Sequence, residues 1–249
     1  MGRVDDYREI LRSLEDWDAF LLQESRLPGP RGNLELAAAV AQEGVEAQFL
    51  RWAALDAEAA PGDMPAGFLA FCGVMGLGYL AARGGTRNFG LLRERASDPR
   101  WRIREAVAVG LQAYGEADPE GLLSLMTAWS NGTLLERRAV VATLCEPALL
   151  EEQEFAARTL DLLDHITTSI LDQPERRSED FRVLRKGLAY GWSVAVAAHP
   201  ELGKPRMAQW IGAQDADIRW IMKQNLGKAR LVRMDAAWVQ AQLAALDGK

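Results

Sequence analysis

An arginine that recurs at the same place in successive helical segments most constrains the fold of this 249-residue chain. Its spacings are 33, 48 and 34 residues, and it stands at Arg104, Arg137, Arg185 and Arg219. A large apolar residue follows each arginine seven positions later, at Leu111, Leu144, Trp192 and Leu226. Such repetition is typical of arrays in which each helix pair buries its apolar face against the next pair.

The segments between these markers also have helical patterns, and no stretch alternates in the manner of a half-buried strand. Proline falls mostly between the periodic segments, as at Pro61, Pro99 and Pro200. It fits the first turn of a helix and cannot continue a helix that precedes it. The third repeat carries extra residues, which we expect to lengthen its first helix, 150–171, and the following loop, 172–178. The chain is therefore predicted to be all-α.

The repeats resemble the HEAT-repeat family, whose antiparallel helix pairs carry an Asp and an Arg six residues apart at the second helix. Asp98, Asn131 and Glu179 fill the Asp position of three repeats, six residues before Arg104, Arg137 and Arg185. The fourth repeat departs from the pattern, because Ala213 stands six residues before Arg219. The resemblance implies that the polar residues cap free N–H groups and that the arginines bond them and the next repeat, forming a structural ladder.

The resemblance also implies the domain organisation. We expect one right-handed α-solenoid domain, 1–249, with about five to six helix pairs. Capping helices are expected over 1–64 and 231–249, and recognisable repeats over 65–230.

Composition narrows the classes of function. No apolar run reaches the ~20 residues that a membrane helix needs, and the first residues lack the apolar core of a secretory signal. The two cysteines, Cys72 and Cys145, lie in apolar stretches and are expected to be buried free thiols, as in a reducing cytoplasm. His165 and His199 have no partners at metal-ligand spacing, and no nucleophile or phosphate-loop motif is present, so we expect no metal, cofactor or catalytic centre.

Charge is sorted between the two helices of each repeat. The net charge is −6, yet the second-helix segments 100–114, 132–145, 176–192 and 215–233 are all net positive. In HEAT-like proteins these helices line a concave face, so the resemblance implies a basic groove for an anionic partner, either nucleic acid or an acidic or phosphorylated protein segment. The candidate groove residues are Arg100, Trp101, Arg102, Arg138, Lys186, Trp220, Lys223, Lys228, Arg230 and Arg233.

Structural roles compete with this interpretation. The arginines of the ladder are more simply explained as structural residues, and helices often carry basic residues near their C-termini because the helix dipole favours them there. Most of the eight tryptophans are expected in the core. Trp101 and Trp220 are the exceptions, since each lies beside an arginine of the ladder and could stack on a base or on a cationic alkylated base.

Two functions therefore stay open. The first is a non-catalytic binding scaffold with a basic groove. The second follows from a resemblance in size and tryptophan content to the HEAT-like DNA alkylation repair proteins, and it is an alkylated-DNA-binding protein or an alkylpurine DNA glycosylase. Glycosylases of that family use an aspartate near tryptophans in the cleft, a motif with no counterpart in the repeats here. The resemblance thus supports DNA binding more than base release.

Overall fold

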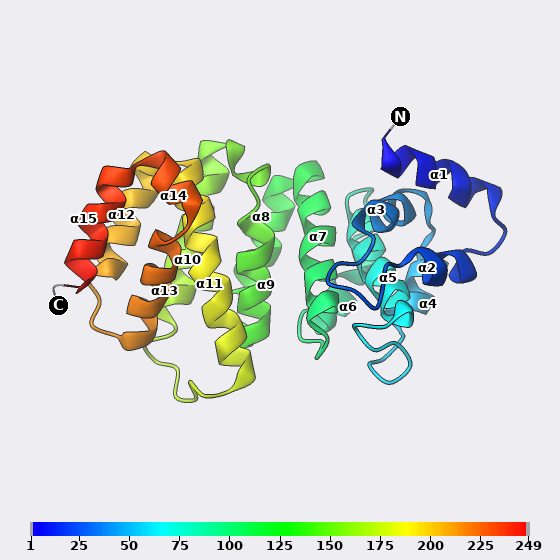
Figure 1. The fold of residues 1–249 in the computed structure, drawn as a ribbon, viewed down its shortest axis with the longest axis horizontal. Coiled ribbons are helices and arrows are strands. Elements are labelled where there is room, and N and C mark those ends of the chain that lie inside the picture. The colour runs from blue at the N-terminus through cyan, green and yellow to red at the C-terminus, as the bar shows by residue number, and fades with distance from the viewer. Residues whose placement is uncertain (1, 248–249) are drawn as a thin grey trace. The chain divides into compact units, whose positions relative to one another are not determined.

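The computed structural model describes residues 2–247 and confirms the all-α class. Helix accounts for 74% of the structure, and the described residues form fifteen α-helices and no strand. The helices group into two compact units, 1–118 and 119–249 (Figure 1). The division falls between the seventh and eighth helices, inside the stretch predicted to hold the repeats.

Unit 1, residues 1–118, contains seven α-helices and one short 3-10 turn, Thr86–Asn88. The helices are α1 (Arg3–Ser13), α2 (Asp18–Glu24), α3 (Leu34–Glu43), α4 (Glu46–Ala53), α5 (Pro65–Ala81), α6 (Phe89–Arg95) and α7 (Trp101–Ala117). The segment 1–64, expected to cap the chain, thus forms four short helices.

The helix α5 is the centre of unit 1. It is apolar on all sides, and nearly every residue from Gly67 to Gly78 is buried, as expected of a helix enclosed by its neighbours. It packs against α2, α3, α4, α6 and α7. Gly78 lets α7 approach closely, because a side chain there would collide with the backbone of Gly110.

Unit 2, residues 119–249, contains the remaining eight α-helices. They are α8 (Pro119–Trp129), α9 (Leu134–Leu144), α10 (Gln153–Thr168), α11 (Glu179–Ala198), α12 (Pro200–Ile211), α13 (Ala216–Leu226), α14 (Ala229–Met234) and α15 (Ala236–Asp247). The helix expected over 150–171 is divided into a 3-10 turn, Leu149–Glu151, and α10, because Glu152 between them has an extended backbone.

The helices of unit 2 alternate between two rows. One row is α8, α10 and α12, and the other is α9, α11 and α13. Consecutive helices of the chain also pack together, as α10 does with α11 and α12 with α13. A side-chain cap begins each of the three second-row helices, at Thr133, Ser178 and Asp215. Trp192, fully buried in α11, lies in the core between the rows.

Candidate functional site

The candidate residues predicted from sequence divide between the two units. Arg100, Trp101 and Arg102 belong to unit 1. The other candidates belong to unit 2, and they are Arg138, Lys186, Trp220, Lys223, Lys228, Arg230 and Arg233. The two sets therefore describe two separate places in the molecule.

Arg100 is buried, which corrects its assignment as a groove residue. Its side chain is only 6% exposed and forms an ion pair of 2.7 Å with the Asp98 carboxylate. The guanidinium also donates to the carbonyl oxygens of Leu55, Asp56 and Ala60, each at 2.9 Å. Arg100 thus ties the loop after α4 to the start of α7, because a buried guanidinium needs partners for its N–H groups.

The expected ladder differs in unit 1. The Asp98 carboxylate binds Arg100, the nearer arginine. Arg104 reaches the same turn through the backbone, donating to the carbonyl oxygens of Asp98 at 2.6 Å and Pro99 at 3.0 Å. Arg104 therefore fixes the turn before α7 through backbone carbonyl oxygens, whereas the Asp98 carboxylate binds Arg100.

In unit 2 the ladder is also rearranged. Asn131 donates to the Thr127 carbonyl oxygen, and the exposed Glu179 pairs with Arg182. Arg137 has a buried Nε without an acceptor, while Arg219 donates to the Leu246 carbonyl oxygen.

One ladder arginine does bond the next repeat. Arg185 donates to the Asp217 carboxylate at 2.5 Å, and its guanidinium lies 4.3 Å from the centre of the Trp220 ring. Arg176 binds Asp217 and Asp215 as well. Burial alone would raise the pKa of Asp215, but the Arg176 hydrogen bond and backbone N–H groups lower it overall. Trp220 is thus one side of this ion-pair cluster, which gives it a structural role.

Several other cations of unit 2 are neutralised by neighbouring carboxylates. Arg206 of α12 binds Asp161 and Asp164 of α10. Lys204 binds Asp235 at 2.7 Å, and this hydrogen bond lowers the pKa of Asp235. These bridges join helices of the first row and the C-terminal segment. They leave little free positive charge on that side of the unit.

A different arrangement surrounds Tyr190, whose side chain is 49% exposed on α11. The Arg230 guanidinium lies 4.4 Å from the ring centre and donates to the Tyr190 hydroxyl at 2.5 Å. The Lys228 Nζ lies 5.8 Å from the same ring centre. Lys186 is exposed one turn earlier on α11, so its side chain emerges on the same face as Tyr190. We call these four residues the Tyr190 patch.

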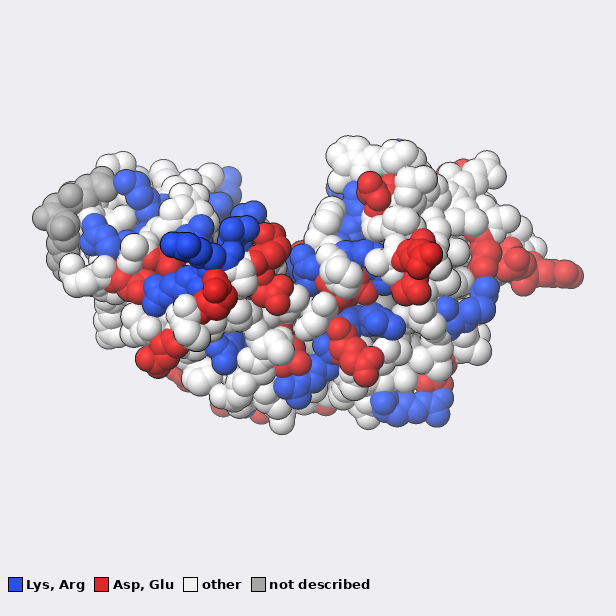
Figure 2. All heavy atoms as spheres, turned by 90° about the horizontal axis from the view of Figure 1, so that it is seen from below, with Lys and Arg blue, Asp and Glu red and all other residues white. Residues whose placement is uncertain are grey.

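The cations of the Tyr190 patch have no carboxylate partner. Neither Lys186, Lys228 nor Arg230 forms an ion pair with any residue in the described part of the chain. Arg138 of α9 borders the patch, since a side chain at Gly187 would touch its Cγ. Arg233 and Lys223 are exposed on α14 and α13. Figure 2 shows that both signs of charge are mixed on the face seen from below.

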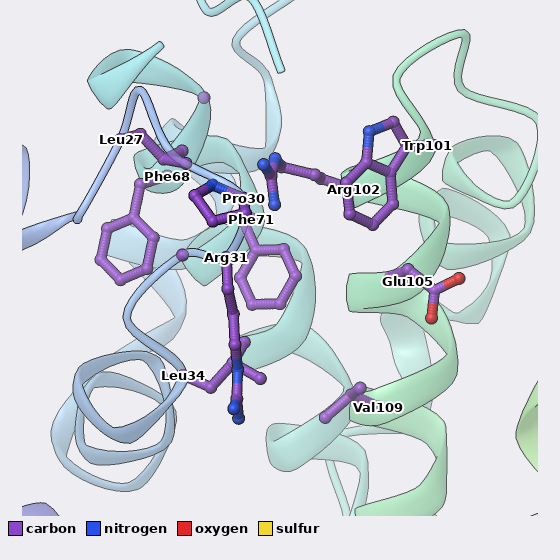
Figure 3. Close-up of a pocket in the computed structure, with 12 residues that line it drawn as sticks. Leu27, Pro30, Arg31, Leu34, Phe68, Phe71, Trp101, Arg102, Glu105 and Val109 are labelled. Carbon is purple, nitrogen blue, oxygen red and sulfur yellow. The ribbon is translucent and has the colours of Figure 1, made fainter. Parts of the chain in front are cut away.

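Trp101 and Arg102 lie at a cavity of about 250 Å³ in unit 1. Its apolar walls come from the loop after α2 and from α3, α5 and α7, with Phe68 and Phe71 of α5 at the centre (Figure 3). Trp101 is 53% exposed, and the Arg102 guanidinium lies 4.5 Å from its ring centre. The sequence pattern thus identified two lining residues of a cavity, although they do not belong to the set in unit 2.

Sequence reasoning missed two components. Tyr190 was not singled out, although its spacing of four residues from Lys186 was a usable signal. The loop at 26–33 carries no motif that indicates a site, yet Leu27, Pro30 and Arg31 line the cavity. Nothing in the sequence alone brings that loop beside α5 and α7.

The structure shows neither a metal centre nor a membrane helix in the part it describes. Within residues 2–247, no group of three or more His, Cys, Asp or Glu side chains could hold a metal ion. None of the described helices is both long and apolar enough to cross a membrane. In comparisons with known proteins, no family model, no curated protein and no solved structure matches this chain.

Proposed function

We propose that this protein is a non-catalytic binding scaffold that holds an anionic macromolecule at the Tyr190 patch of unit 2. The proposal rests on one difference among the cations of unit 2: some are paired with carboxylates, and those of the Tyr190 patch are paired with none among the described residues. Arg206, Lys204 and Arg176 are neutralised by carboxylates. Lys228 and Arg230 instead lie against the exposed Tyr190 ring, and Arg230 also donates to its hydroxyl.

Unpaired cations attract anions even on a protein of net negative charge. Surface ion pairs cancel the local potential, whereas several unpaired cations close together add to it. Lys228 and Arg230 lie against one ring, and Lys186 is exposed one turn earlier on the same helix as that ring, so the three can act on the same anionic segment. Three acidic residues of the first-row helices, Glu120, Asp161 and Asp164, are used in bridges.

Nucleic acid is the partner that the patch favours. An exposed aromatic ring among cations is the combination that binds a phosphate backbone and stacks on bases. The Tyr190 hydroxyl and the Arg230 guanidinium are held together by their hydrogen bond, so the ring orientation is fixed before binding. An acidic or phosphorylated protein segment would use the cations but would not need the ring, which makes the two partners separable by experiment.

The fold supports a scaffold of the HEAT-like type. The two rows of helices in unit 2 are the arrangement expected of stacked helix pairs, and we propose that these pairs form a right-handed solenoid with the second row on its concave side. The Tyr190 patch lies on the second-row helix α11 and on α14 beside it. The buried free thiols Cys72 and Cys145 suit a reducing cytoplasm, where we place the protein.

The test is a titration of binding against salt. Fluorescence anisotropy would follow a labelled 20-base-pair DNA duplex between 50 and 200 mM NaCl. Neutralising about three phosphates predicts a logarithmic salt slope near −2.7, so Kd should rise roughly 40-fold over this range. The double substitution Lys186→Glu and Arg230→Glu should abolish most of the affinity at 50 mM and flatten the slope.

The matched control removes a neutralised cation. Arg158→Glu, on α10, reverses a charge that is already paired with Glu120, and it should leave Kd within about twofold. Tyr190→Leu should weaken DNA binding several-fold but leave binding of a polyglutamate peptide unchanged if nucleic acid is the partner. Absence of binding to both the duplex and the peptide at 50 mM NaCl would sink the proposal.

A second candidate function rests on Trp101. Its exposed ring and the Glu105 carboxylate stand one turn apart on α7, so an aromatic face and a negative charge could together hold a cationic alkylated base. Figure 3 shows the Glu105 side chain directed away from Phe71. This candidate predicts tighter binding of duplexes that contain an alkylpurine. Release of the base, lost in Glu105→Gln, would establish a glycosylase, and equal binding of both duplexes would remove the candidate.

A further inference from the structure

The cavity of unit 1 has the construction of a small-ligand site. Phe68 and Phe71 are 2% and 7% exposed, and Leu27 is 8% exposed, so its walls are buried apolar side chains. Leu34 and Val109 complete them from α3 and α7. At about 250 Å³ the space exceeds the ~150 Å³ that accommodates a benzene ring, so a ligand body of roughly ten non-hydrogen atoms fits it.

The cavity is formed before any ligand arrives, because its loop is fixed from within. Asn33 is fully buried, donates to the Tyr7 hydroxyl and the Glu24 carbonyl oxygen, and accepts from the Leu36 backbone N–H. The Ser25 hydroxyl accepts from the Leu27 N–H. These bonds hold both ends of the loop, so a ligand would not need to order it, and the entropic cost of binding is small.

Arg102 supplies an unsatisfied donor at this cavity. Its Nη2 donates to the Gly29 carbonyl oxygen at 2.9 Å, which draws the guanidinium across from α7 to the loop. Its Nε is buried and has no hydrogen-bond partner. In Figure 3 the side chain reaches from α7 toward Pro30. The buried Nε is out of reach of a ligand, so a carboxylate in the cavity would bind the remaining terminal N–H groups of the guanidinium.

The charge at the cavity is positive overall. Arg31 is a second guanidinium in the lining, on the exposed side of the loop, and Figure 3 shows it extending along the Leu34 side. Glu105 is the single acidic residue of the lining, and its side chain is directed away from Phe71. Guanidinium groups bind carboxylates with paired hydrogen bonds. The apolar walls and the two arginines therefore select a ligand with an apolar body and one carboxylate.

We infer that the cavity of unit 1 binds a small amphipathic carboxylate, with its aromatic or branched alkyl body against Phe68 and Phe71 and its carboxylate on Arg102. Arg31 screens the charge at the open side. The site is independent of the Tyr190 patch, since every lining residue belongs to unit 1. Either proposal can fail while the other stands.

The test uses three probes on the full-length protein. Isothermal titration calorimetry would compare 3-phenylpropionate, the matched amide 3-phenylpropanamide, and acetate. The acid should bind at least tenfold more tightly than the amide, because a charge-assisted hydrogen bond to Arg102 is stronger than a neutral one. Acetate should show no measurable binding, since it lacks the apolar body. Equal affinities of the acid and the amide, or absence of binding by both, would overturn the inference without any variant.

Two variants locate the site. Arg102→Gln should remove the preference for the acid over the amide, and Val109→Trp should abolish binding of both by filling the cavity. Lys186→Glu, in unit 2, is the charge control and should leave the affinity for 3-phenylpropionate unchanged. A circular dichroism melt would verify that each variant is folded. Full acid preference in folded Arg102→Gln would contradict the assignment. Binding of a phenylalanine-containing peptide without binding of 3-phenylpropionate would also contradict it, by assigning the cavity to a protein partner.

Discussion

The two units use arginine in opposite ways. In unit 1, Arg100 is buried, and its guanidinium binds the Asp98 carboxylate and three carbonyl oxygens. In unit 2, Arg230 is turned to the surface, where its partner is the exposed Tyr190. Both residues lie in net positive segments of the sequence, so the number of cations in a segment does not decide which of them can bind an anion. A cation can bind an external anion only where nearby carboxylate and carbonyl oxygens leave some of its N–H groups free.

The cores of the two units also differ in how their helices are arranged. Unit 1 is organised around α5, a helix apolar on all sides, and the surrounding helices leave an apolar cavity beside Phe68 and Phe71. Unit 2 is organised as two rows of amphipathic helices whose outer charges bridge neighbouring helices. The first arrangement suits an apolar ligand, and the second leaves the cations beside Tyr190 without a carboxylate partner among the described residues.

The largest expected effect concerns the buried ion pair of unit 1. Asp98→Ala leaves the Arg100 guanidinium buried beside carbonyl oxygens alone, and it should cost about 3–5 kcal/mol of the free energy of unfolding. Urea denaturation followed by circular dichroism would measure it. A cost below about 1 kcal/mol would mean that Arg100 behaves like a surface cation, and the contrast between the units would fail.

Buried amides provide a test in which the units should behave alike. Asn225 in unit 2 accepts from the Ser193 N–H and donates to the Leu188 and Ile221 carbonyl oxygens. Asn225→Ala should cost roughly 1–3 kcal/mol, because it leaves buried backbone groups without partners. Asn33→Ala should cost a similar amount in unit 1. Chemical denaturation of each variant checks this, and a large difference between them would show that one unit tolerates water at its buried amide.

A smaller effect is expected for the bridges on the outside of unit 2. Arg158→Ala removes the exposed pair with Glu120 and should change the free energy of unfolding by less than about 1 kcal/mol, since solvent screens such pairs. The same denaturation measurement applies. A loss comparable to that of Asp98→Ala would mean that the bridges of unit 2 are as structural as the buried pair of unit 1.

The pH dependence should be the smallest effect and should affect both units. Hydrogen bonds from Arg51 and Arg12 lower the pKa of Asp18 and Glu43 in unit 1, and the bond from Lys204 lowers that of Asp235 in unit 2. A folded-state pKa below the unfolded value adds stability that is complete above about pH 5 and is lost as the pH falls through the folded value.

Thermal melts between pH 7 and pH 3 would test this. The melting temperature should be constant down to about pH 5 and then fall, and added salt should reduce the change because these pairs are partly exposed. A melting temperature that rises as the pH falls below 4 would contradict the assignment of these ion pairs.

The periodicity of the sequence was sufficient to predict the helices but not their partners. The second-row helices of unit 2 begin at side-chain caps, because capping depends on residues within one turn. The roles of Asp98 and Arg100 could not be predicted, because Arg100 reaches carbonyl oxygens more than forty residues away in the chain. The cavity escaped prediction for the same reason, since its walls come from three separate stretches of the chain.

The candidate site was predicted in part. Lys186, Lys228 and Arg230 were selected by charge, and the structure places two of them against one aromatic ring. Tyr190 was not selected, because a tyrosine in an amphipathic helix is usually buried with only its hydroxyl exposed. Its contact with Lys228 and Arg230 depends on α14 lying beside α11, and these segments are 30 or more residues apart.

The most direct test of the central claim is an NMR titration of the ¹⁵N-labelled protein with a short DNA duplex at 50 mM NaCl. We expect the backbone amide resonances of α11 around Lys186 to Gly191 and of residues 228–231 to shift, and the amide resonances of α5 to stay unchanged. Shifts confined to unit 1, or the absence of shifts at saturating duplex, would contradict the claim that unit 2 carries the anion-binding surface.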